Sequence, residues 1–185
     1  MKLRQTIAPV APPVTLAEMK AHLYILHDRD DLMITSMIFQ ATQSAEIDMN
    51  RQIMPATYEL YFDALSTEMV LPRPPFISLE SFQIFDGEAW NDVDPLDYLL
   101  DDKGEPAALY MRNFPGEISS DRNSVKVVYK AGWEDATKVP EPIKAWIKIQ
   151  VSTFYEHRDE FVLNATVNKL PHVDGLIQRY RIHNV

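Results

Sequence analysis

The sequence predicts an α+β fold, with helices toward both ends of the chain and a β-rich insertion between them. Apolar residues recur at helical spacing in residues 15–51 and 140–158, whereas they alternate with polar residues at several places within 55–131. Prolines separate these two kinds of pattern. A chain of 185 residues fits one domain, so we expect a single helical core of three main helices and a short C-terminal one, interrupted by the insertion.

The first part of the chain is expected to hold an extended arm and two helices. Residues 1–14 form the arm, because several prolines there restrict the backbone and remove amide donors. Thr15 and Glu18 have the spacing of a capping box, which predicts a short helix that ends at about His27. A second, longer helix is predicted over 30–51 from one apolar stripe, formed by Ile34, Met37, Ile38, Ala41, Ala45 and Met49.

The rest of the chain is expected to hold the strands and two further helices. Alternation is clearest at 58–62 and 125–130, and Asp86-Gly87 is typical of a hairpin turn. A third helix is predicted over 140–158, because Pro142 suits a first turn and apolar residues follow at helical intervals. The C-terminal segment, 164–185, is expected to be irregular at first and then to form one short helix.

The charge of the chain argues against a protein that grips DNA. The net charge is −9, and ten acids stand against Lys103 and Arg112 between residues 86 and 121. Binding to DNA phosphates requires a basic surface, so we expect duplex DNA to be repelled. Cysteine is absent and no run of eighteen apolar residues occurs, so we expect neither disulfides nor a membrane partner. The ten acids are Asp86, Glu88, Asp92, Asp94, Asp97, Asp101, Asp102, Glu105, Glu117 and Asp121.

No motif in the sequence predicts catalysis, a metal or a cofactor. His22 and His27 are five residues apart, so they would lie about 140° apart around a helix and share no face. The cluster at Glu156–Glu160 suits a helix C-terminus, where His and Arg complement the helix dipole. The acids of the insertion lack an EF-hand loop, and no glycine-rich phosphate loop is present. We therefore expect a protein that is not an enzyme and binds no cofactor.

Two tryptophans are candidates for binding. Trp146 lies on the apolar stripe of the third helix and is expected to be part of the core. Trp133 follows a strand and a glycine turn, where it either packs the sheet onto the helices or contributes an aromatic side chain to an interface.

Several segments follow one another in a distinctive order along the chain. They are Pro13–Leu23, Asp28–Asp31, Arg51-Gln52 before Thr57–Leu60, Leu71–Pro75, Tyr129–Asp135 before Val139–Ile143, and Tyr155–Asp159. Each segment alone is a common pattern, but their order and spacing are more specific and cover the chain from Pro13 to about Tyr180. In this order they resemble the head–tail connector proteins of phages, also called adaptor or head-completion proteins, which gene transfer agents carry as well. His157 stands where the family usually has Asn, and the acidic insertion is a further departure.

This resemblance implies a structural role in the neck of a virion, between head and tail, for a protein made in the host cytoplasm. The family's position implies a ring of twelve copies below the portal, in which one face of each copy meets a different face of the next. Its partners would be the portal protein, neighbouring copies and a downstream neck or tail protein. DNA would pass through the ring without specific binding.

The C-terminal segment is the candidate for docking to the portal. It offers few apolar residues for its own domain, so we expect it to become ordered on a partner and to leave a folded domain when residues 172–185 are removed. The candidate contacts are Leu176, Ile177, Arg179, Tyr180, Arg181 and Ile182.

Two other functions stay open from the residues alone. One is a binding module outside viruses whose acidic surface engages a basic partner. The other is a small enzyme, which a deep pocket lined by convergent titratable groups would indicate.

Overall fold

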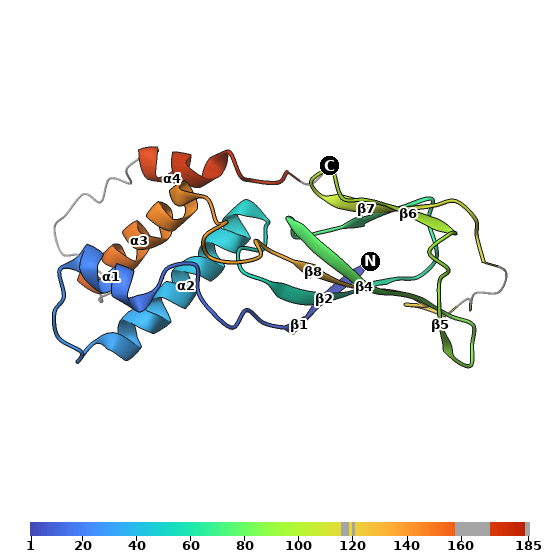
Figure 1. Cartoon of the computed structure of the whole chain (residues 1–185), viewed down its shortest axis with the longest axis horizontal. Helices are drawn as coiled ribbons and strands as arrows, with labels where there is room; N and C mark the ends of the chain where they lie inside the picture. The colour runs from blue at the N-terminus through green and yellow to red at the C-terminus, as the bar shows by residue number, and fades with distance from the viewer. Residues whose placement is uncertain (116–118, 120, 158–170, 184–185) are drawn as a thin grey trace. The chain divides into compact units, whose positions relative to one another are not determined.

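The computed structural model describes residues 1–115, 119, 121–157 and 171–183, and it confirms the α+β class (Figure 1). The chain divides into two compact units. The β unit comprises Met1–Val10 and Met54–Glu134, and the helical unit comprises Ala11–Ile53 and Asp135–Val185. Each unit is therefore built from two separate stretches of chain. The expectation of a single domain stays a prediction.

The β unit contains two antiparallel sheets. Five strands form the larger sheet in the order β1 (Lys2–Ile7), β2 (Ala56–Phe62), β8 (Val125–Ala131), β4 (Phe76–Phe85) and β5 (Trp90–Asp92). Three strands form the smaller sheet in the order β3 (Glu68–Leu71), β7 (Ala107–Met111) and β6 (Tyr98–Asp101). All these strands except β1 lie within the predicted insertion.

The N-terminal arm is extended, as predicted, and part of it belongs to the larger sheet. Residues Lys2–Ile7 form β1, which pairs with β2 in the register Lys2↔Tyr61 to Ile7↔Thr57. Leu3 packs against the core of the unit, whereas the other side chains of β1 are exposed. The prolines from which an extended arm was predicted follow this strand, so they do not interrupt its hydrogen bonding.

Apolar side chains from both sheets form one core in the β unit. The strand pattern predicted for residues 125–130 is confirmed, because the side chains of β8 are alternately buried and half-buried. Tyr129 is 1% exposed, and its hydroxyl donates a hydrogen bond to the carbonyl oxygen of Pro72 at 2.7 Å. Burial raises the pKa of Tyr129, which keeps the phenol neutral and able to donate. Among the other fully buried members are Leu60, Met69, Leu71, Leu109, Val125 and Val127.

Gly132, directly after β8, is required by a close approach of two backbone segments. Its φ is +119°, and a Cβ atom at this position would lie 2.6 Å from the carbonyl oxygen of Met54. Its N–H donates to the carbonyl oxygen of Pro75 at 2.8 Å. Only glycine satisfies these conditions, which gives a physical reason for the Tyr129–Trp133 motif.

The helical unit contains α1 (Leu16–Leu23), α2 (Asp31–Met49), α3 (Glu141–Glu156) and α4 (Pro171–Gln178). The capping box is confirmed: the Glu18 N–H donates to the Thr15 hydroxyl at 3.2 Å, and the Thr15 N–H donates to the Glu18 carboxylate at 2.7 Å. The N–H and the hydroxyl of Thr15 both donate to the Glu18 carboxylate, and these two hydrogen bonds hold the pKa of Glu18 below its usual value. α1 ends four residues before His27, because Tyr24 takes a left-handed conformation (φ 57°) that closes the helix.

The core of the helical unit lies between α2, α3 and α4. Of the six residues in the predicted stripe of α2, Met37 is half-buried and the other five are almost completely buried. These five are Ile34, Ile38, Ala41, Ala45 and Met49. Trp146 on α3 is 3% exposed, which confirms it as a core residue. Its Nε1–H has no hydrogen-bond acceptor among the described residues.

Candidate assembly surfaces

The C-terminal segment is fastened to the end of α2. The N–H of Ile182 donates to the carbonyl oxygen of Met49 at 2.9 Å, and the buried guanidinium of Arg51 donates to the carbonyl oxygen of Tyr180. α2 has no basic residue in its last turn, so Arg51 brings a positive charge to the partial negative charge at that end of the helix.

The expectation that this segment has little to bury in its own domain is wrong. Val173 and Ile177 of α4 are 7% and 5% exposed, and they join the core of the helical unit. They are four residues apart, so they lie on the same face of the helix. Removing residues 172–185 therefore removes core side chains together with any docking surface. Residues 164–170 lie outside the described residues.

The six predicted contact residues differ in what they can offer a partner. Ile177 is buried, so its prediction as a contact is corrected. Leu176, Tyr180 and Ile182 are half-buried, and Arg179 and Arg181 are exposed. The guanidinium of Arg179 lies 4.8 Å from the centre of the Tyr180 ring. What remains available on this segment is mainly positive charge.

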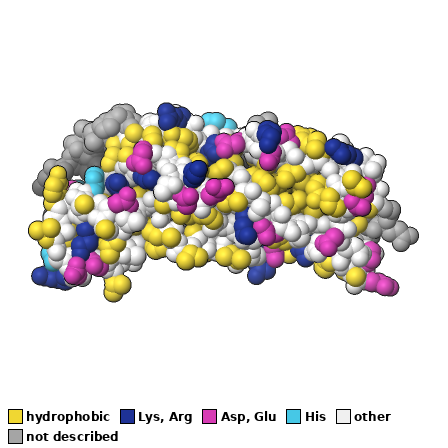
Figure 2. Space-filling model, in the orientation of Figure 1, with side chains coloured by type: hydrophobic (Ala, Val, Ile, Leu, Met, Phe, Trp, Pro, Cys, Tyr) yellow, Lys and Arg dark blue, Asp and Glu magenta, His cyan; other side chains and the backbone are white. Residues whose placement is uncertain are grey.

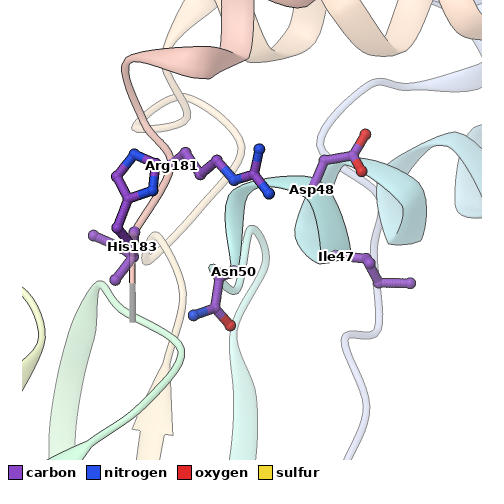
Figure 3. A pocket seen from close by; sticks show the side chains of 6 residues that line it. Ile47, Asp48, Asn50, Arg181 and His183 are labelled. Carbon is purple, nitrogen blue, oxygen red and sulfur yellow. The ribbon is translucent and has the colours of Figure 1, made fainter. Parts of the chain in front are cut away.

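A pocket of about 300 Å³ lies between the end of α2 and the C-terminal segment (Figure 3). In this view the guanidinium of Arg181 points toward Asp48, the imidazole of His183 lies at about the same height as Arg181, and Asn50 lies below them. This lining is polar and brings together one acid, one guanidinium and one imidazole, without a nucleophile paired to a base. It is lined by Ile47, Asp48, Asn50, Arg181, Ile182 and His183.

The outer face of α2 carries no charge along most of its length. Leu32, Phe39 and Ile47 are 87%, 37% and 71% exposed, and the exposed residues between them are Ser36, Gln40 and Gln43. At about 100° per residue, five of these six residues lie within a stripe about 80° wide, and Gln40 lies beside that stripe. In a chain with 24% charged residues, such a face is typical of a surface covered in an assembly, because interface cores are depleted of charge. Periodicity located the buried stripe of α2 but drew no attention to this outer one.

The remaining candidates are less distinctive. Trp133 is half-buried immediately after Gly132, and its role in an interface stays a prediction. On the face drawn in Figure 2, charged side chains of both signs are interspersed with apolar ones. In the described parts of the chain, no group of three His, Cys, Asp or Glu side chains is placed to hold a metal ion. Nor is any helix there long and apolar enough to cross a membrane. Residues 158–160 of the Glu156–Glu160 cluster lie outside the described residues.

Comparisons with known proteins identify the fold. No protein-family model matches the chain, and no curated protein matches it. Solved structures do match, and three of them are components of gene transfer agent (GTA) particles. One is a chain of the neck of an empty GTA particle computed with C6 symmetry, and another belongs to the virion of a native GTA particle. Each matches with a TM-score of 0.83 at 18% sequence identity. In both cases the match covers 100% of this chain and 97% of the other chain. A chain of the neck of a native GTA particle, computed with C12 symmetry, matches with the same coverage, a TM-score of 0.77 and 19% identity.

The chain thus has the fold of a GTA particle protein over its whole length. The resemblance to the connector proteins of gene transfer agents is confirmed at the level of the fold.

Proposed function

We propose that this chain is a structural, non-enzymatic subunit of the neck of a phage or of a gene transfer agent. The observation that carries the proposal is the match of the entire chain to a neck chain of a GTA particle at a TM-score of 0.83. The match covers the whole chain and therefore includes both compact units. A chance likeness of one small sheet or one helix pair would cover only part of the chain.

The proposed role is that of a head–tail adaptor. Copies of the chain form a ring below the portal, twelve in number, which lengthens the DNA channel and offers a platform to the next neck or tail protein. The C12 symmetry of one matching neck supports this copy number. The uncharged outer face of α2 supports a protein whose surface is covered on assembly. A net charge of −9 suits a channel in which DNA must slide without binding.

The portal contact is proposed to lie at the C-terminal segment. Arg179 and Arg181 are exposed there, and Leu176, Tyr180 and Ile182 are half-buried beside them. Because the segment is anchored to α2 through Met49 and Arg51, it presents these side chains from a fixed base. A contact of this kind would recognise an acidic surface of the portal.

The experiment removes the gene from the element that encodes the chain and images the particles by electron microscopy. Particles without the chain should lack one ring of density in the neck, and their heads should fail to join tails. Wild-type protein supplied in trans should restore both. Particles with a normal neck and normal tails in the absence of the chain would refute the proposal.

Variants supplied in trans test the portal contact in the same assay. Arg181→Glu together with Arg179→Glu should leave a folded protein that restores completed particles poorly. The matched control is Arg29→Glu with Lys138→Glu, which changes the net charge equally at exposed positions of the helical unit. Equal restoration by both variants would place the portal contact elsewhere.

A further inference from the structure

The five-stranded sheet of the β unit has two open edges. Its order begins at β1 and ends at β5, so each of these strands is paired on one side only (Figure 1). In β5 the peptide groups of Trp90 and Asp92 point outward. The carbonyl oxygen of Ala89 accepts from the N–H of Asp86 at 3.2 Å, and the N–H of Val93 donates to the carbonyl oxygen of Phe82 at 2.9 Å, so Ala89 and Val93 face β4. Residues that face the partner strand alternate with residues that face away from it along an antiparallel strand, which leaves Trp90 and Asp92 facing outward. Such an edge can accept another strand.

The two edges carry opposite charge. β1 presents Lys2 and Arg4 on exposed side chains, and its other residues are uncharged. At the other edge, Asp92 lies on β5 and Glu88 lies in the turn that precedes it, both exposed. None of these four side chains takes part in an ion pair between described residues.

Neighbouring groups in the same copy compensate these charges in part, and they include Lys126, whose ammonium lies 4.6 Å from the centre of the Trp90 ring. Glu59 on β2 lies opposite Arg4 and accepts a hydrogen bond from the Tyr61 hydroxyl at 3.0 Å. Asp92 accepts one from the side-chain amide of Gln83 at 2.8 Å, which leaves its negative charge in place.

The charges at the two edges are too far apart to neutralise each other within one copy. Three strands lie between β1 and β5, so the edges are separated by about four strand spacings, or roughly 19 Å. This is more than twice the Debye length of about 8 Å at physiological salt. Each edge therefore keeps its charge toward solvent and toward an incoming partner.

We infer that the β1 edge of one copy lies against the β5 edge of the next copy, with Lys2 and Arg4 facing Glu88 and Asp92. Opposite charge at opposite edges favours head-to-tail association, in which two different surfaces meet, and this is the kind of contact that closes into a ring. Pairing of two β1 edges would instead bring Lys2 and Arg4 of both copies together, which disfavours a two-fold dimer. Ile7 at the end of β1 and Trp90 on β5 are 58% and 39% exposed and supply apolar surface at the same two edges.

The inference rests on the proposed function for the ring itself, and it adds the surfaces through which the copies meet. Two variants test it. In the first, Lys2→Glu with Arg4→Glu makes both edges acidic; in the second, Glu88→Lys with Asp92→Lys makes both edges basic. All four positions are exposed, so circular dichroism and thermal melting should show folded proteins.

Each variant alone should restore completed particles at least about tenfold less well than wild type, because every contact in the ring becomes repulsive. The two variants supplied together should restore them, since acidic and basic copies can alternate around a ring with an even number of subunits. The control Arg29→Glu with Lys138→Glu should behave as wild type in this respect if only the edges matter. Sedimentation of the purified proteins, alone and mixed, measures the same pattern of association without the particle.

The outcomes separate the two proposals. Normal particles without the chain would refute the function, and sedimentation would then still decide on the edge contact. If the chain is needed but both reversed variants restore particles as well as the control, or if their mixture restores no better than either alone, the edge contact is overturned.

Discussion

Substitution of Gly132 by alanine tests whether the close approach after β8 holds the β unit together. The added methyl group would lie 2.6 Å from the carbonyl oxygen and 2.7 Å from the carbonyl carbon of Met54. Both contacts are with backbone, which cannot rotate away as a flexible side chain can. The chain at Gly132 must therefore move, and the hydrogen bond from its N–H to Pro75 would be lost or lengthened.

The expected loss of stability follows from two terms. A non-glycine residue at a φ of +119° costs about 1–3 kcal/mol, and loss of the hydrogen bond to Pro75 adds about 1 kcal/mol. We expect Gly132→Ala to lower the free energy of unfolding by about 3 kcal/mol. For a chain of this length that corresponds to a decrease in Tm of about 6–12 °C.

Gly87→Ala is the matched control, measured with Gly132→Ala by urea denaturation followed by circular dichroism. Gly87 has a similar φ of +112°, but nothing lies within 4 Å of the position that its Cβ would occupy. It lies in an exposed hairpin turn that can relax, so we expect a loss of about 1 kcal/mol. If the two variants lose the same stability, the contact with Met54 is not the reason for glycine at position 132.

Two further predictions concern the core and the charge. Trp146→Phe should change the free energy of unfolding by less than about 1 kcal/mol, because it removes a buried N–H that has no acceptor among the described residues. Trp146→Ala should lower the free energy of unfolding by about 3–5 kcal/mol. A large loss in the Phe variant would mean that the indole N–H is hydrogen-bonded. Duplex DNA should bind the purified protein weakly or not at all at about 150 mM salt, and a sub-micromolar Kd with a steep salt dependence would contradict the argument from charge.

Local patterns in the sequence predicted local structure well. The hydrogen bonds of a capping box join residues three apart, so Thr15 and Glu18 sufficed to place the start of α1. The alternation in β8 likewise depends on adjacent residues, and the buried stripe of α2 follows from a single helical period. In each case the signal and the structure lie within one element.

What the sequence did not reveal depends on partners far along the chain. β1 forms because Lys2–Ile7 pairs with residues of β2 that lie fifty to fifty-nine positions later, and no pattern within the arm indicates that partner. Ile177 is buried because α4 packs beside α3. The sequence around it contains few apolar residues, and for that reason it predicted a segment that becomes ordered only on a partner. The same limit applies to the predicted portal contacts, because the burial of Ile177 depends on α3 and not on its own segment.

The acidic character of residues 86–121 has a structural cause that a count of charges cannot reveal. Short strands joined by tight turns need side chains that accept from nearby backbone N–H groups, and aspartate does this well. Asp86 accepts from Glu88 and Ala89, Asp94 from Leu96, and Asp101 from Lys103. The hydrogen bonds from the backbone of Ala89 and Glu88 lower the pKa of Asp86, which keeps this turn in place at neutral pH.

These turn-forming carboxylates already have a role within the copy, so they need no partner to explain them. Glu88 and Asp92 differ, because neither caps a turn in this way and both lie at an open sheet edge. The order of strands then places the chain's N-terminal Lys2 and Arg4 at the opposite edge. A sequence that is acidic in its middle and basic at its start thus becomes a sheet with two unlike edges, and a sheet of that kind favours addition of copies in one direction.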